Sequence, residues 1–230
     1  MIRFRNQQGV QREGDGRDNA GGGVGMTDRQ RARDIAGWSA ATEARLGVYA
    51  ALLTRWQKVV NLVAPSTLSS VWVRHFADSS QVADLCPTAR VWLDLGSGAG
   101  FPGLVTAILL ADDTKGLVHL VESDKRKCAF LREVSRETGA RTVIHDRRIE
   151  EVVPALAVTI DAISARALAP LPLLVAHSER FLLKGATGVF LKGQDVAQEL
   201  TGVTSDCRFI VNLVPSRTDP RASVVIVKSA

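Results

Sequence analysis

The sequence predicts an α/β fold in which a mostly parallel sheet carries an antiparallel hairpin at one edge and a helical annex at its N-terminal side. Three observations predict it. The chain has 230 residues, 46% hydrophobic and 23% charged, which is the balance of a globular protein that can bury a core. After Pro87, short β-rich runs alternate with helical stretches, as in successive βαβ units. Before Pro87, the apolar residues follow a helical period instead.

The N-terminal part is expected to be a disordered tail over residues 1–25, followed by the helical annex over 26–88. The tail contains seven glycines and too few large apolar side chains to form a core, and Met26 at its end is a candidate natural start. From about residue 34 to 60, apolar residues recur at steps of three or four, as on one face of an amphipathic helix. Residues 68–85 are expected to form one or two further short helices.

Seven strands and three long helices are expected in the remaining segment, residues 89–230. The expected strands are Val91–Leu95, Leu117–Glu122, Arg141–His145, Ile160–Ala165, Gly188–Lys192, Phe209–Val214 and Ser223–Lys228. The expected helices are Pro102–Leu110, Lys125–Thr138 and Leu171–Leu183. Because no long helix separates the last two strands, they are expected to pair as an antiparallel hairpin at the sheet edge.

Composition excludes several classes of protein. No apolar run approaches the roughly 18 residues of a membrane span, so no membrane partner is expected, and without an apolar leader the expected location is the cytoplasm. Three widely separated cysteines predict neither a disulfide framework nor a metal site. The net charge of +5 is concentrated between Lys125 and Arg148, which fits either a polyanionic partner or a solvated helix face.

The segment from Val91 to Gly103 carries the clearest chemical signal. An apolar strand ends in Asp94, and glycines at alternate positions then allow a tight turn and a close approach to a ligand. Pro102 suits the first turn of a helix, and Glu122 ends the next strand. A carboxylate so near the loop disfavours a pyrophosphate and suits a ligand with a cationic amino-acid end, while Glu122 suits the two hydroxyls of a ribose. The other interpretation of Glu122 is a surface acid at a strand end.

This strand, loop and helix resemble motif I of the class I S-adenosylmethionine-dependent methyltransferases. Ile149 and Glu150 follow the third strand, where such enzymes contact adenine, although Glu150 also suits a helix N-terminus. The fourth strand, where methyl acceptors are held in this fold, lacks both Asn-Pro-Pro-Tyr and Pro-Cys. What remains there is Arg166, a fixed cation with five donors, which either faces the substrate or forms a structural ion pair with an acid such as Asp94 or Glu150.

Further motifs closely resemble the glucose-inhibited division protein B family of 16S ribosomal RNA guanine-N7 methyltransferases. In chain order they are Arg74-His75-Phe76-Ala77-Asp78-Ser79, the loop from Asp94 to Gly103, Val121-Glu122-Ser123, Arg148-Ile149-Glu150, Ala165-Arg166-Ala167 and Leu191-Lys192-Gly193. The likeness runs from about Leu52 to Lys228. The chain departs from the family at Val63, which replaces a threonine, so any hydroxyl role is missing there.

The resemblance implies a Rossmann-like methyltransferase domain over residues 89–230, with S-adenosylmethionine as the cofactor. Residues expected to contact the cofactor are Asp94, Gly96, Gly98, Gly100, Phe101, Glu122, Ser123, Ile149, Glu150 and Arg166. Arg166 is also the candidate catalytic residue, facing the methyl group and the target base. Residues expected to contact RNA or to cover the cofactor are Arg74, His75, Asp78, Lys125, Arg126 and Lys192.

The implied function is methyl transfer to N7 of a guanine in the decoding-region loop of 16S rRNA, by a monomer acting on the RNA or on the small ribosomal subunit. N7 carries a lone pair and no proton, so positioning and desolvation suffice and His75 has no general-base role. Arg166 or Lys192 is expected to donate to guanine O6, and Phe101 to offer a stacking surface.

Three other functions remain open at this point. A small-molecule methyltransferase would share the loop and Glu122 but would need no basic face. An NAD-dependent oxidoreductase would need room for a pyrophosphate that Asp94 does not leave. A noncatalytic RNA-binding module would explain the charge but not the paired acids.

Overall fold

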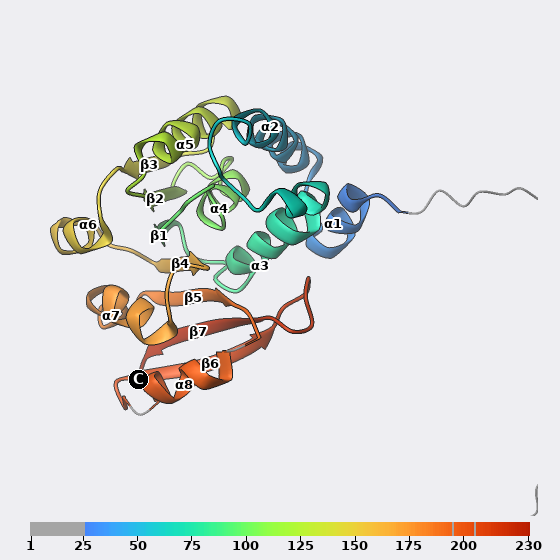
Figure 1. Ribbon diagram of the computed structural model, residues 1–230. Coiled ribbons are helices and arrows are strands. Elements are labelled where there is room, and N and C mark those ends of the chain that lie inside the picture. The colour runs from blue at the N-terminus through green and yellow to red at the C-terminus, as the bar shows by residue number, and fades with distance from the viewer. Residues whose placement is uncertain (1–25, 195, 205) are drawn as a thin grey trace, which may run out of the picture.

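The computed structural model describes residues 26–194, 196–204 and 206–230, so the expectation for residues 1–25 lies outside the described residues. A seven-stranded sheet with helices on both faces forms its centre (Figure 1). The strands are β1 (Val91–Leu95), β2 (Leu117–Val121), β3 (Thr142–His145), β4 (Ala162–Arg166), β5 (Thr187–Lys192), β6 (Phe209–Pro215) and β7 (Ser223–Ser229). The helices are α1 (Asp28–Ala36), α2 (Ala40–Trp56), α3 (Asp78–Asp84), α4 (Gly103–Leu109), α5 (Lys125–Thr138), α6 (Ile149–Ala155), α7 (Leu171–Leu182) and α8 (Val196–Thr204), with a short 3₁₀ helix η1 (Pro65–Ser70) and a π-helix η2 (Trp72–Ala77).

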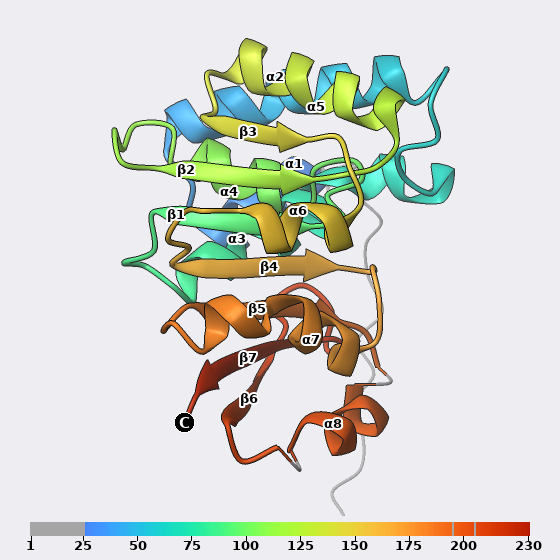
Figure 2. The ribbon, with the colours of Figure 1, turned by 90° about the vertical axis from the view of Figure 1, so that its left-hand side faces the viewer.

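The sheet has the strand order β3-β2-β1-β4-β5-β7-β6, which confirms the predicted fold class. Strands β1 to β5 are parallel, and β7 pairs antiparallel with both β5 and β6 (Figure 2). The chain leaves β1 toward β2 on one side and returns to β4 on the other. This reversal places a crevice beyond the carboxyl ends of β1 and β4, which is where ligands bind in open α/β sheets.

Successive side chains of β1 point to opposite faces of the sheet, and each face carries its own hydrophobic core. Trp92 points into the core formed by α2 to α5, together with Tyr49 and Phe130. Leu93 and Leu95 point into the opposite core, beneath α6, α7 and α8. The N-terminal helices therefore share a core with the sheet, because α2 packs on α4 and α5 (Figure 1).

The predicted helix over residues 34–60 is two helices in the structure. Thr27 and Gln30 form a capping box that starts α1, and Gly37 ends it with a left-handed φ of 64°. Ser39 then caps α2 by accepting from the backbone N–H of Thr42. The seven strands lie within two residues of their predicted limits, whereas α8 was not expected. Among the described helices, none has the length and apolar character that crossing a bilayer requires.

Candidate active site

The glycine-rich loop after β1 is held open by one carboxylate from the neighbouring strand. Gly98 has a φ of 57°, a left-handed conformation that favours glycine, and its N–H donates to Glu122 Oε2 at 2.8 Å. The other oxygen of Glu122 accepts from the backbone N–H of Asp124 at 2.8 Å. Asp124 itself caps α5. Glu122 is therefore fixed at both oxygens, and each oxygen retains a lone pair for a ligand hydroxyl.

Asp94 lies beneath this loop and is fully buried. Its Oδ1 accepts from the hydroxyl of Ser164, the residue opposite it on β4, at 2.6 Å. A Cβ added at Gly103 would lie 2.6 Å from Oδ2, so only glycine lets α4 start this close to the carboxylate. Burial raises the pKa of Asp94 to about 6, although hydrogen bonds from Ser164 and Ser97 oppose the shift.

A first cavity of about 500 Å³ opens above the loop, at the carboxyl ends of β1, β2 and β4. Eight of the ten residues expected to contact the cofactor line it: Gly96, Gly98, Phe101, Glu122, Ser123, Ile149, Glu150 and Arg166. Asp94 and Gly100 do not. Asp94 is covered by the loop, and the α-carbon of Gly100 faces the hydroxyl of Tyr49 and Leu104 instead.

The first cavity also has walls formed by residues that were not among the expected cofactor contacts. They include Leu62, Val63, Lys127, Arg147, Arg148, Ala167, Leu168 and His177. Leu168 rests on the loop, because a Cβ added at Gly96 would lie 2.5 Å from its Cδ1. His177 reaches the cavity from α7, with Nε2 3.8 Å from Glu150 Oε1. No local motif marks Leu168 or His177, since the fold alone brings α7 beside the start of α6.

Arg166 ends β4 and lines both the first cavity and a second one beside it. Its guanidinium donates to three acceptors on η2 and α3: the carbonyl of Arg74 at 3.2 Å, His75 Nδ1 at 2.9 Å and Asp78 Oδ2 at 3.5 Å. The ion-pair partner is thus Asp78, and neither Asp94 nor Glu150 as the sequence suggested. The next residue, Ala167, has a φ of 50°, an uncommon conformation for a residue with a side chain.

His75 is a neutral acceptor for Arg166. Its Nε2 lies 2.9 Å from the hydroxyl of Thr67, and its Nδ1 accepts from Arg166. Burial, reinforced by the positive charges of Arg166 and Arg74, lowers the pKa of His75 to about 3. With Nδ1 occupied as an acceptor, the imidazole orients the guanidinium and holds no proton to exchange there.

Phe101 has no free ring face. It stacks on Tyr49 at 5.3 Å and on His75 at 4.8 Å between centroids, and only 4% of it is exposed. The Arg166 guanidinium carbon also lies 4.8 Å from the ring centroid. The expectation that Phe101 offers a stacking surface to a base is therefore wrong, because protein rings already cover it.

The residues expected to contact RNA divide between two places. Arg74, His75, Asp78 and Lys192 line the second cavity. Lys192 donates to the carbonyl of Ala169 at 2.9 Å and pairs with Glu199 at 2.6 Å. Lys125 and Arg126 line neither cavity and lie in the first turn of α5.

The first cavity fits a nucleoside ligand. Its volume lies in the range of small-molecule sites, and its floor is a loop whose Gly98 faces open space, with no side-chain atom within 4 Å of an added Cβ. Glu122 offers the fixed pair of acceptors that a ribose diol needs. Charged side chains of both signs line the cavity, with Glu122 and Glu150 as the acids and Lys127, Arg147 and Arg148 among the cations, so ligand groups of either charge have a partner there.

Comparison with known proteins agrees with this geometry. Residues 42–220 match the family model described as rRNA small subunit methyltransferase G. The chain is 49% identical over 204 residues to a protein of that name from Methylobacterium sp. (strain 4-46), covering 88% of this chain and 96% of the relative. It is 46% identical over 200 residues to the one from Bradyrhizobium sp. (strain BTAi1), covering 87% and 90%.

Solved structures share the fold at low sequence identity. A putative O-methyltransferase from Klebsiella pneumoniae superposes with a TM-score of 0.58 at 14% identity, covering 89% of this chain and 98% of that one. An O-methyltransferase from Bacillus cereus in complex with SAH gives 0.57 at 15% identity, with the same coverage. These likenesses support the class I methyltransferase fold.

Proposed function

The chain belongs to the rRNA small subunit methyltransferase G family, and on that premise we propose that it transfers a methyl group from S-adenosylmethionine to N7 of a guanine in the 530 loop, the decoding-region loop of 16S rRNA. The observation that carries the proposal is the position of Arg166. This cation lines the cavity above the glycine loop and also the neighbouring cavity, so one side chain faces both reactants.

The first cavity is the cofactor site in this proposal. Glu122 accepts the ribose hydroxyls with the lone pairs that Gly98 and Asp124 leave free. Ile149 and Glu150, at the start of α6, contact the adenine, while Gly96, Phe101 and Ser123 complete the walls; all five line the cavity. Asp94 and Gly100 act from beneath, where they set the shape of the loop.

Methyl transfer to guanine N7 requires little from the protein beyond positioning the two reactants. S-adenosylmethionine supplies a methyl group on a positively charged sulfur. Guanine N7 has an exposed lone pair and no proton, so no general base is required. Arg166, held by His75 and Asp78, donates to guanine O6 beside N7 and so sets the angle of approach. The neutral state of His75 is consistent with this role, because a protonated ring would repel the guanidinium.

The RNA strand is held by the basic residues around the two cavities. Lys125 and Arg126 in the first turn of α5 lie beside Lys127, which lines the first cavity, and they face phosphates. Arg74 and Lys192 contact the acceptor near the second cavity. The protein acts as a monomer in the cytoplasm, on free 16S rRNA or on the small ribosomal subunit.

The proposal is tested by incubating the protein with a labelled methyl donor and either deproteinised 16S rRNA or intact 30S particles, and then mapping the modified nucleotide. Label at N7 of one guanine in the decoding-region loop is expected. Label elsewhere in the RNA would contradict the assignment of the target. Transfer to a metabolite without transfer to RNA would identify a small-molecule methyltransferase instead.

A further inference from the structure

A second cavity of about 690 Å³ adjoins the first on the far side of Arg166. Its walls come from α1, η2, the ends of β4 and β5, and the turn that joins β6 to β7. The two cavities share four lining residues: Leu62, Val63, Arg166 and Ala167. A group bound in the second cavity is therefore separated from the first by little more than the Arg166 side chain.

The charges of the second cavity are balanced, whereas those of the first are not. Four cations line the second cavity, and each lies within 4 Å of a carboxylate: Arg31 with Asp28 at 3.4 Å, Arg74 with Asp219 at 3.9 Å, Arg166 with Asp78 at 3.5 Å, and Lys192 with Glu199 at 2.6 Å. In the first cavity, Lys127, Arg147 and Arg148 have no such partner within the described part of the chain. A phosphate would be held better beside these three cations, and an uncharged group with polar edges suits the second cavity.

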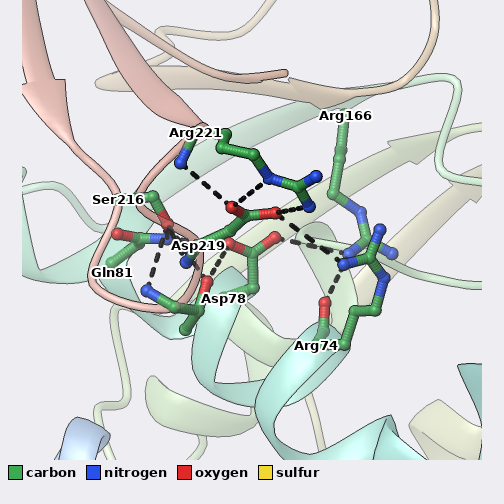
Figure 3. Close-up of polar contacts among 8 residues, drawn as sticks. Arg74, Asp78, Gln81, Arg166, Ser216, Asp219 and Arg221 are labelled. Atoms are coloured by element: carbon green, nitrogen blue, oxygen red, sulfur yellow. Dashed lines mark hydrogen bonds and ion pairs between the residues drawn. The ribbon is translucent and has the colours of Figure 1, made fainter. Parts of the chain in front are cut away.

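The β6–β7 turn, residues 216–222, fixes two acidic side chains in the second cavity (Figure 3). The Thr218 hydroxyl donates to Asp78 Oδ1 at 2.7 Å, and Gln81 donates to the same oxygen at 2.9 Å. Gln81 also accepts from the backbone N–H of Arg217 at 3.1 Å. The turn is thereby attached to α3, far from it in the sequence, and Asp78 is held toward Arg166.

Of these two acidic side chains, Asp219 is the one that can accept a further hydrogen bond from a ligand. Its Oδ1 accepts twice from Arg221, and its Oδ2 accepts once from Arg221 at 3.1 Å, with Arg74 at 3.9 Å (Figure 3). A carboxylate offers about four acceptor positions, so one remains on Oδ2. About a quarter of the side chain is exposed, which leaves it open to the cavity. Asp78 also has three donors, but less of its side chain is exposed, 17%, and its Oδ2 already faces Arg166.

We propose that the second cavity holds the target guanine base, unstacked from its RNA, with its exocyclic amino group donating to Asp219. The proposal rests on the proposed function. Along the polar edges of guanine, N7 comes first, O6 next and the amino group last. In the protein, Arg166 lines both cavities and Asp219 lines only the second, so a base with N7 toward the first cavity and O6 at Arg166 has its amino group on the side of Asp219. A base removed from its stack is usually read in this way, by hydrogen bonds to its pairing edge.

Two substituted RNAs separate this inference from the proposed function. Both are decoding-region fragments in which only the target guanosine is replaced, by inosine in one and by 7-deazaguanosine in the other. Inosine lacks the amino group but keeps N7 and O6, so kcat/KM is expected to fall about tenfold or more, because Asp219 loses a donor. The 7-deaza base has carbon in place of N7, so transfer to it is expected to stop. Methylation of the 7-deaza fragment at that base would overturn the proposed function.

Equal kcat/KM for guanosine and inosine fragments, measured with the unaltered protein, would overturn the inference while leaving N7 methylation intact. The variant Asp219→Ala sharpens this result, since it should reduce the preference for guanosine to nearly one. Arg217→Ala is the matched control on the same turn, because its side chain reaches out to Asp84 and does not line the cavity. It should retain the preference. An Asp219→Ala protein that binds cofactor normally and still prefers guanosine tenfold would exclude Asp219 as the acceptor.

Discussion

The two cavities on either side of Arg166 are formed by different kinds of groups, mainly main chain in the first and paired side chains in the second. The first is shaped by main chain: a glycine loop, the start of α6 and one acid, Glu122, tied to two backbone N–H groups. The second is shaped by side chains in pairs, such as Thr218 with Asp78, which are 140 positions apart. The cofactor is the same in every reaction, so backbone groups in fixed positions can bind it. The target is one base among four, and side-chain donors and acceptors distinguish it from the others. Each prediction below tests whether this division holds.

The largest effect is expected at Glu122, the acid on which the first cavity depends. Glu122→Ala removes the partner of two backbone N–H groups and of both ribose hydroxyls, and hydrogen bonds to a charged group contribute about 1.5–3 kcal/mol each. Cofactor affinity should fall about a thousandfold in calorimetry. Glu137→Gln, a change at an exposed acid paired with Arg136 on α5, is the control and should bind normally. Normal binding by Glu122→Ala would place the cofactor elsewhere.

The floor of the first cavity predicts a pH dependence of stability. Burial raises the pKa of folded Asp94 to about 6, above its ordinary 3.8, so the folded protein holds this proton more tightly than the unfolded chain does. Its contribution to the free energy of unfolding is therefore complete below about pH 4 and is lost as pH rises through about 6. The loss amounts to about 3 kcal/mol.

Urea unfolding of the unaltered protein and of Asp94→Asn across this range measures that contribution. The buried histidines act in the opposite direction, because the pKa of His75 is lowered to about 3 and that of His119 to about 4. Their contribution is lost as pH falls, and it is common to both proteins. The difference between the two curves therefore isolates Asp94. A difference that stays constant from pH 4 to pH 7 would mean that Asp94 titrates normally.

A somewhat smaller effect is expected at Arg166, the boundary between the cavities. Arg166→Ala should slow methyl transfer about a hundredfold, because small losses of alignment at the reacting atoms are costly. Cofactor affinity should change only a few-fold, since Glu122 and the loop remain. Single-turnover transfer to 16S rRNA, together with calorimetry, separates the two quantities. Transfer at the unaltered rate would make Arg166 a structural partner of Asp78 alone.

The same division explains which parts of the site could be predicted from sequence. The strand, the glycine loop and Glu122 lie within 32 residues, and β-strand register brings Glu122 back to Gly98. Local pattern therefore predicted the glycine loop and Glu122, and the family resemblance added other residues that line the first cavity, such as Ile149 and Arg166. The burial of Asp94 depends on Ser164, its neighbour on β4, and no local signal reports a neighbour that distant.

The second cavity could be predicted only in part. The motif from Arg74 to Asp78 indicated one wall, but the opposite wall is the β6–β7 turn, which the sequence described only as an edge hairpin. The turn reaches α3 because β7 pairs with β5 and so passes close to the carboxyl end of β4. That position follows from strand order, which periodicity does not determine. The break between α1 and α2 at Gly37 was missed for a simpler reason, since the apolar period continues across it.

The smallest expected effect is on the salt dependence of RNA binding, which tests the difference in charge between the two cavities most directly. Single-stranded RNA gives a logarithmic salt slope of about 0.7 for each phosphate neutralised. Changing Lys127, Arg147 and Arg148 together to glutamine should therefore reduce the slope of RNA affinity against salt by about 2, because these cations have no acidic partner within the described residues. Arg74→Gln should leave the slope nearly unchanged, because Arg74 already lies beside Asp219. Fluorescence anisotropy with a labelled decoding-region fragment at four salt concentrations measures both. Equal slopes for the two variants would mean that Lys127, Arg147 and Arg148 contact phosphate no more than Arg74 does, and the argument from ion pairing would fail even if the cofactor site stands.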